Sequence, residues 1–118
     1  MRTDAITPPP ARKRTLRGPR ELLADALLTL AERKGRISRH DEKSWASITF
    51  AGSRHRVQLV FEGDDAVEAG ECFVAFLPEH EFSLRGQLVA DAAVIEVESV
   101  LAPPRLAVTC EILLLEES

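Results

Sequence analysis

Apolar residues are concentrated between residues 87 and 117, and their pattern predicts a long β-hairpin. Two apolar-rich stretches, 87–101 and 106–115, flank the sequence Ala-Pro-Pro-Arg at 102–105. Proline lacks a backbone N–H and fixes its own φ angle, so a proline pair interrupts a strand and favours a turn. The rest of the chain is therefore expected to supply the elements that cover this hairpin.

A helix is predicted over residues 19–34. Apolar side chains recur at three- and four-residue steps from Leu22 to Ala31, which gives the helix one apolar face. Pro19 suits the first helical position, because its missing N–H has no partner there in any case. Gly35 suits the position just after the helix. The apolar face is expected to pack on the core.

A second, shorter hairpin is predicted to follow this helix. Residues 45–51 and 54–62 alternate between apolar and polar side chains, as half-buried strands do. The dipeptide at 52–53, Gly-Ser, is expected to form the tight turn between them. In the second strand Arg54 and Arg56 share the polar side, so both are expected to be exposed.

Residues 64–77 fit two interpretations. The apolar run at 72–77 is compatible with a buried strand, but a helix is favoured. An aspartate at 64 or 65 can cap the helix, and Pro78 can end it. Gly70 counts against a helix by about 1 kcal/mol. The apolar residues that form a single helical stripe are Ala69, Cys72, Phe73, Phe76 and Leu77.

The predicted order of elements is helix, hairpin, helix, hairpin. This order indicates an α+β fold with two layers, in which two helices cover one face of a four-stranded, mainly antiparallel sheet. Residues 19–118 are expected to form this single domain. Residues 1–18 contain three successive prolines and few large apolar residues, so they are expected to form a disordered basic N-terminal arm.

The net charge of -4 conceals a strong asymmetry between the two halves of the chain. Residues 1–56 hold 13 Lys/Arg and 6 Asp/Glu, a net charge of +7, whereas residues 57–118 hold 2 and 13, a net charge of -11. Such a division indicates either an acidic partner for the basic half or mutual neutralisation of the halves, within or between subunits. Both interpretations are open at this point.

The basic arm is the first candidate binding site. Clustered cations of this kind can neutralise phosphates and release counterions, so nucleic acid or an acidic protein is a possible partner. Aromatic residues do not occur between the basic ones, so base stacking has no support. The candidate polyanion-binding residues are Arg12, Lys13, Arg14, Arg17 and Arg20.

A second candidate is a small-molecule site near the histidines. In an extended segment Glu79 and Glu81 share a face, with His80 between them. His55 on the first hairpin could join His80 if the fold brings the two together. The other histidine lies in the polar stretch 36–44, which is expected to be a solvated connector containing His40-Asp41-Glu42.

Residues that could carry catalysis or bind a cofactor form no known motif. The chain lacks metal-ligand spacing and the G-x-S-x-G nucleophile motif, and its glycines are scattered. Cys72 and Cys110 are expected to be free, buried thiols. We therefore expect no metal and no cofactor, and the balance of the evidence is against an enzyme.

No apolar run is long enough to cross a membrane, and the N-terminus lacks a secretory signal core, so the cytoplasm is the expected compartment and no membrane partner is expected. Arginine outnumbers lysine 12 to 3, a composition that suggests a bacterial source.

Leu113 and Leu115 do not fit a sheet with one solvated face. Apolar and polar residues alternate from residue 106 to 111, and large apolar residues then occupy both faces. Val89 and Ile95 lie on the same outer face if their strand has no bulge. A folded-back tail, or helices on both faces, would also bury these residues. We predict instead a twofold homodimer with Leu113 and Leu115 at its interface.

The function expected from these features is a small non-catalytic interaction module that forms a homodimer. One alternative is a nucleic-acid-associated regulator that uses the basic arm. The other is a small enzyme or ligand-binding domain with a pocket near His55 and His80.

Overall fold

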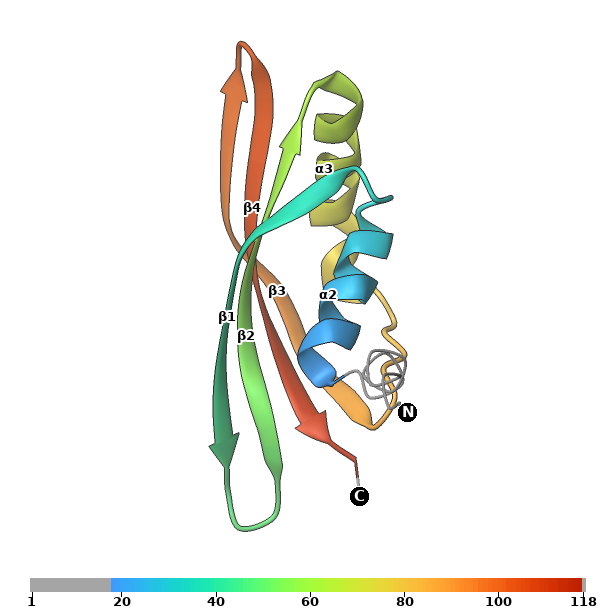
Figure 1. The fold of residues 1–118 in the computed structure, drawn as a ribbon, viewed down its shortest axis with the longest axis vertical. Coiled ribbons are helices and arrows are strands. Elements are labelled where there is room, and N and C mark those ends of the chain that lie inside the picture. Colours follow the sequence, from blue (N-terminus) through green and yellow to red (C-terminus); the bar gives the residue numbers. More distant parts are fainter. Residues whose placement is uncertain (1–17, 118) are drawn as a thin grey trace, which may run out of the picture.

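The computed structural model of this protein describes residues 18–117 and shows a four-stranded antiparallel sheet covered on one face by two helices (Figure 1). The predicted α+β class and order of elements are confirmed. Except for Gly18, the expected N-terminal arm lies outside the described residues. The elements are α2 (Pro19–Leu30), β1 (Gly35–Ala46), β2 (Ala51–Glu62), α3 (Asp64–Phe76), the 3-10 helix η1 (Leu77–Glu79), β3 (Gln87–Leu101) and β4 (Pro104–Glu116).

The sheet has the strand order β1-β2-β4-β3, so β2 and β4 are central and β1 and β3 are its edges. The predicted hairpin of β3 and β4 is confirmed, with its turn between Leu101 and Pro104. The helix-covered face of the central strands forms the core with α2 and α3. Its fully buried large side chains include Leu23, Leu27, Leu59, Phe61, Phe73, Val108, Ile112 and Leu114.

The first helix ends earlier than predicted, at Leu30 instead of Lys34. The chain then turns through Glu32 and Arg33, which adopt left-handed φ angles of 59° and 58°. The Arg33 guanidinium donates to the Asp25 carboxylate at 2.7 Å, which ties this turn back to the helix. Gly35 begins β1 and does not cap the helix. A Cβ at Gly35 would lie 2.7 Å from the Phe61 ring, so the close approach of the strand requires glycine here.

The polar stretch 36–44 was expected to be a connector, and this prediction was wrong because it forms most of β1. An edge strand has one neighbour and less to bury, so it does not need the apolar alternation that marks a central strand. The turn lies at 47–50 and not at 52–53. Gly52 is inside β2, where a Cβ would overlap the carbonyl oxygen of Leu114 on β4.

Helix α3 confirms the helical interpretation of residues 64–77, with its end one residue earlier than expected. Its N-cap is Gly63, so the aspartates lie in the first turn, where carboxylates favour the helix dipole. The buried stripe is rotated from the predicted one. Phe76 is 58% exposed and Cys72 is half-buried, whereas the buried members are Ala66, Ala69, Gly70 and Phe73.

Two β-bulges in β3 change which of its side chains face the helices. They lie between Val89 and Asp91 and between Val94 and Glu96. Val89 pairs with the buried Leu114 and packs against the core, so it does not share the outer face with Ile95 as expected for a strand without bulges. Ile95 is the extra residue of the second bulge and is 45% exposed, lining a hollow on the outer face.

Candidate functional site

A hydrogen-bonded chain of polar side chains lies under α2, on the helix-covered face of β1 and β2. The Ser53 hydroxyl is 2.7 Å from His55 Nε2, and His55 Nδ1 is 2.8 Å from His40 Nε2. His55 is fully buried and Ser53 is nearly so. The two imidazole rings meet edge to face, with centroids 5.1 Å apart. We call His40 and His55 the histidine pair.

Arg20 connects the histidine pair to the first turn of α2. Its guanidinium donates to the backbone carbonyl of His40 at 2.7 Å and lies 3.5 Å from the Glu42 carboxylate. Burial, with the positive charge of Arg20 as a second cause, lowers the pKa of His40 to about 4. Burial also lowers the pKa of His55. Both imidazoles are therefore neutral at pH 7 and act as hydrogen-bonding groups of the core.

Along this hydrogen-bonded chain a hydroxyl is followed by two imidazoles, an order that resembles the nucleophile, base and orienting group of a hydrolase. A substrate needs access to the nucleophile, and here the hydroxyl and its base are both in the interior. Neither Ser53 nor His55 lines the hollows found on the surface of the described residues. The geometry thus supports a structural role, in which the chain joins α2 to the first hairpin.

This polar chain was missed from sequence because 36–44 was assigned to a connector. Ser53, His55 and Val57 share one face of β2 by the two-residue period, so the inward direction of His55 was already implied, whereas Ser53 had been placed in the predicted turn. His40 could be placed opposite only once β1 was recognised as the partner strand, since it pairs with Val57.

The second part of the predicted ligand site lies elsewhere. His80 follows η1 and its ring contacts Phe82 edge to face at 4.6 Å. Glu79, His80 and Glu81 line a surface hollow with side chains from the ends of α2 and α3. In the part of the chain that the structure describes, His80 and His55 share neither a hydrogen bond nor a surface hollow. The fold does not assemble the predicted pair of histidines.

Metal ligands are not gathered either: among residues 18–117 there is no group of three or more His, Cys, Asp or Glu that could hold an ion. Within the same residues, no helix has the length and apolar character needed to cross a membrane. Of the candidate polyanion-binding residues only Arg20 is described, and its guanidinium is engaged by His40 and Glu42. The other four lie outside the described residues, so that site stays a prediction.

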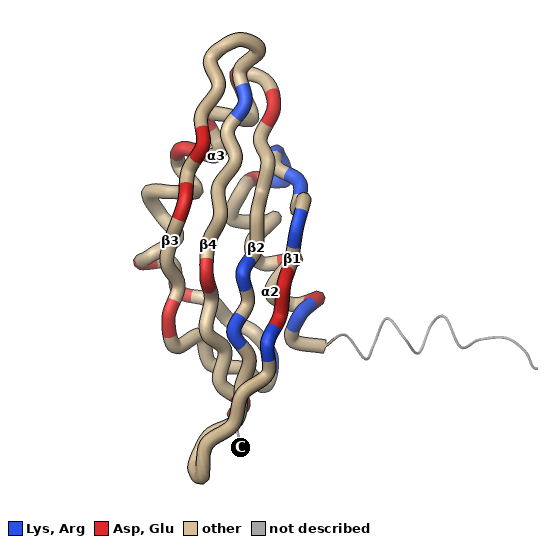
Figure 2. Tube along the Cα trace, turned by 90° about the vertical axis from the view of Figure 1, so that its left-hand side faces the viewer, with Lys and Arg blue, Asp and Glu red and all other residues tan. Residues whose placement is uncertain are grey.

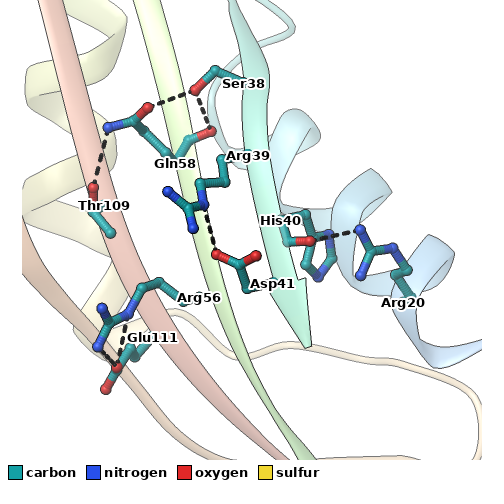
Figure 3. Close-up of polar contacts among 9 residues, drawn as sticks. All are labelled: Arg20, Ser38, Arg39, His40, Asp41, Arg56, Gln58, Thr109 and Glu111. Atoms are coloured by element: carbon teal, nitrogen blue, oxygen red, sulfur yellow. Dashed lines mark hydrogen bonds and ion pairs between the residues drawn. The ribbon is translucent and has the colours of Figure 1, made fainter. Parts of the chain in front are cut away.

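The opposite, uncovered side of the sheet, which we call the outer face, has a polar centre (Figure 3). Arg56 on β2 donates to the Glu111 carboxylate on β4 at 2.6 Å. Arg39 donates to Asp41 on the same edge strand at 2.8 Å. Ser38, Gln58 and Thr109 continue the network across three strands. A shallow hollow of about 220 Å³ lies over these residues and carries charges of both signs.

Leu113 and Leu115 lie on this outer face and are half-buried. Their partners across the sheet are Arg54 and Asp91 for Leu113, and Gly52 and Leu88 for Leu115. Leu88 is 52% exposed. Leu113, Leu115 and Leu88 thus form an apolar patch at one end of the outer face, next to the polar network.

Charge is divided across the outer face by strand (Figure 2). Along the backbone trace, the charged residues of the edge strand β3 are acidic, and those of β1 and β2 are mostly basic. Pairing in the sheet alternates sides, which places Arg36, Arg39, Lys43, Arg54 and Arg56 on the outer face of the first hairpin. The outer-face carboxylates of β3 are Asp91, Glu96 and Glu98. Part of the sequence asymmetry therefore becomes a gradient from one sheet edge to the other.

Large apolar side chains are exposed at the ends of the two hairpins, which we call the apolar tips. Ile48 and Phe50 are 105% and 56% exposed in the turn between β1 and β2. Val100 and Leu101 are 46% and 89% exposed at the turn between β3 and β4. The two tips extend beyond the helices at opposite ends of the sheet (Figure 1).

Comparison with known proteins gives evidence on the fold alone. No protein-family model matches the chain, and no curated protein matches it. One solved structure that is similar is described as "Virion of native gene transfer agent (GTA) particle", with a TM-score of 0.53 and 12% sequence identity. The match covers 75% of this chain and 84% of that chain. The same arrangement of helices and strands thus occurs in a protein of very different sequence.

Proposed function

We propose that this protein is a small non-catalytic interaction module that binds further copies of itself. The observation that carries the proposal is the exposure of Ile48, Phe50 and Leu101 at the apolar tips. Each large apolar side chain gains about 1.5–3 kcal/mol on full burial, and several left exposed together mark a protein-binding surface. The tips face away from the helix-covered core, so folding of one chain leaves them uncovered.

One further observation supports self-association. The similar solved structure is described as part of an assembled particle, which is a setting in which a fold of this kind contacts other protein chains. Homodimerisation through Leu113 and Leu115 is one form that this association can take.

The compartment is a separate point. Cys72 and Cys110 are free thiols, and free thiols suit the reducing cytoplasm, which we keep as the proposed compartment.

The test is sedimentation velocity of the full chain at tens of micromolar, comparing wild type with Ile48→Ser combined with Phe50→Ser. We expect the wild type to sediment faster than a monomer, and the double variant to shift toward the monomer. Phe76→Ser is the matched control, because Phe76 is 58% exposed but lies on α3, away from the tips. A wild type that is monomeric throughout contradicts the proposal.

A further inference from the structure

Both edges of the sheet are long strands with room for another chain. β1 has 12 residues and β3 has 15. Within the described residues, neither strand has a second strand neighbour on its outer side. Such an edge offers unpaired backbone N–H and C=O groups and is a natural place for another strand to add.

The carboxylates of the β3 edge are not held in close ion pairs by the described residues, although Glu96 lines a hollow together with Arg39 and Arg56 and interacts electrostatically with Arg56. Asp91, Glu96 and Glu98 are exposed, and none forms an ion pair within 4.0 Å among the described residues. On the β1 edge the Arg39 side chain is 74% exposed, although it contacts Asp41. The two edges therefore present opposite charge to solvent (Figure 2).

The strand register shows that these opposite charges lie at corresponding positions along the two edge strands. Glu96 on β3 pairs with Thr109, which pairs with Gln58, and Gln58 pairs with Arg39 on β1. We call such a set of four paired residues, one from each strand, a row. This row crosses the sheet from one edge strand to the other on the outer face. The other rows that end in an acidic residue on β3 and a basic residue on β1 join Asp91 to Lys43 and Glu98 to Arg36.

Two more rows agree with this match. Asp41, the outer-face carboxylate of β1, shares its row with the small neutral residue Ala93 on β3. Trp45 on β1 shares its row with the exposed Leu88 on β3, so an apolar residue ends the row at both edges. No row places two carboxylates or two cations at opposite edges.

We propose that the β3 edge of one copy binds the β1 edge of a second copy, head to tail, which rests on the proposed self-association. β1 and β3 are antiparallel to one another, because three antiparallel pairings separate them. A second copy placed alongside in the same orientation continues the antiparallel sheet. With no slip along the strands, Glu96 meets the Arg39 of the next copy, and Asp91 meets its Lys43.

A twofold contact between like edges is disfavoured by the same charges. Pairing β3 with β3 brings carboxylates together, and pairing β1 with β1 brings cations together, and like charges directly opposite destabilise a sheet. Head-to-tail contacts use two different surfaces, so they close into a ring or continue as a chain. The β-bulges on both edges limit backbone pairing, and the charged side chains have to supply the specificity.

The test is charge reversal followed by mixing. One variant combines Arg39→Glu with Lys43→Glu, which makes both edges acidic. The other combines Asp91→Lys with Glu96→Lys, which makes both edges basic. The self-association constant of each variant alone is expected to be at most about one tenth of the wild-type value. An equimolar mixture of the two variants should recover assembly, because acidic and basic edges alternate again.

The control is Glu68→Lys with Glu71→Lys, the same charge change on exposed residues of α3, which should assemble as wild type does. If wild type assembles and each reversed variant also assembles alone, the edge contact is overturned while the proposed function stands. If wild type is monomeric, the proposed function itself fails. Wild-type assembly should also weaken as salt is raised, and assembly that is insensitive to salt overturns the edge contact without any variant.

Discussion

At the scale of single residues, the main finding is that Ser53, His55 and His40 satisfy one another's hydrogen-bonding groups beneath α2. Ser53 and the histidine pair form a chain of short hydrogen bonds, and a buried polar group without a partner would cost more than such a bond contributes. This explains how a strand can direct a histidine into an apolar core. Burial lowers the pKa of both histidines and keeps the pair neutral.

The neutral state of His40 predicts how stability depends on pH. The folded pKa is about 4, against 6.5 in the unfolded chain. Between these values the unfolded chain binds a proton that the folded protein does not bind. Stability is therefore full above pH 6.5 and falls as the pH is lowered through this window. His55, whose pKa is also lowered, acts in the same direction.

Urea unfolding at about pH 7 and about pH 5, above most carboxylate titration, measures this effect. His40→Gln removes the titrating ring, so its midpoint should fall less than that of wild type between the two pH values. Arg20, Asp41 and Glu42 also act on His40, and they are unchanged in the variant. Equal losses in both proteins would show that the pKa of His40 is not lowered by folding.

Cys110 should react slowly with thiol reagents in the native protein. Its side chain is fully buried, and burial raises its pKa to about 12, so the reactive thiolate is scarce. Cys72 on α3 is half-buried and serves as the internal control. Mass spectrometry after brief native labelling should find Cys72 modified first. Equal labelling of the two thiols would mean that β4 opens easily or that its inward face is misassigned.

At the scale of elements, the prediction succeeded where burial sets a period and failed where it does not. The hairpin of β3 and β4 and both helices carry enough buried apolar residues to be recognised. β1 is a polar edge strand, and its exposed charges resemble those of a loop. The bulges in β3 were invisible because apolar residues occupy both sides of that strand, so the alternation does not reveal an extra residue.

The candidate site was predictable to a smaller extent. His55 was selected, but its partner His40 depends on strand pairing over 15 residues of sequence separation, and its neighbour Ser53 had been placed in the predicted turn. His80 was selected on its neighbouring carboxylates, which are solvated features of a connector. The charge asymmetry was visible in sequence, whereas its distribution over rows of the sheet required the strand order.

Gly70 shows why a residue that disfavours a helix in isolation is used in α3. A Cβ at this position would lie 2.8 Å from Phe61 and from Leu106, so glycine allows the helix to approach the sheet closely. Gly70→Ala gains about 1 kcal/mol of helix propensity but overpacks the core at about 1–3 kcal/mol, and we expect net destabilisation.

Chemical denaturation of four proteins tests this: wild type, Gly70→Ala, Phe61→Leu and the double variant. Replacing the Phe61 ring makes room beside residue 70, so Gly70→Ala should cost less in the Phe61→Leu background. A Gly70→Ala variant more stable than wild type would mean that the helix and the sheet are not closely packed at this point.

At the scale of the whole molecule, the twofold dimer and the head-to-tail contact make different use of the outer face. Leu113→Glu with Leu115→Glu should disperse a face-to-face dimer into monomers, as measured by light scattering. The same double variant should leave a contact between the β1 and β3 edges largely intact, since both leucines lie on the central strand β4. A variant that remains folded and associated as wild type places the interface away from Leu113 and Leu115.

The most direct test of self-association is the solution mass of the full wild-type chain, measured by light scattering across a dilution series from tens of micromolar downward. We predict a mass above that of the monomer at the highest concentration, which falls toward the monomer on dilution, because association depends on concentration. A monomer mass at every concentration would contradict self-association, and with it the proposed function.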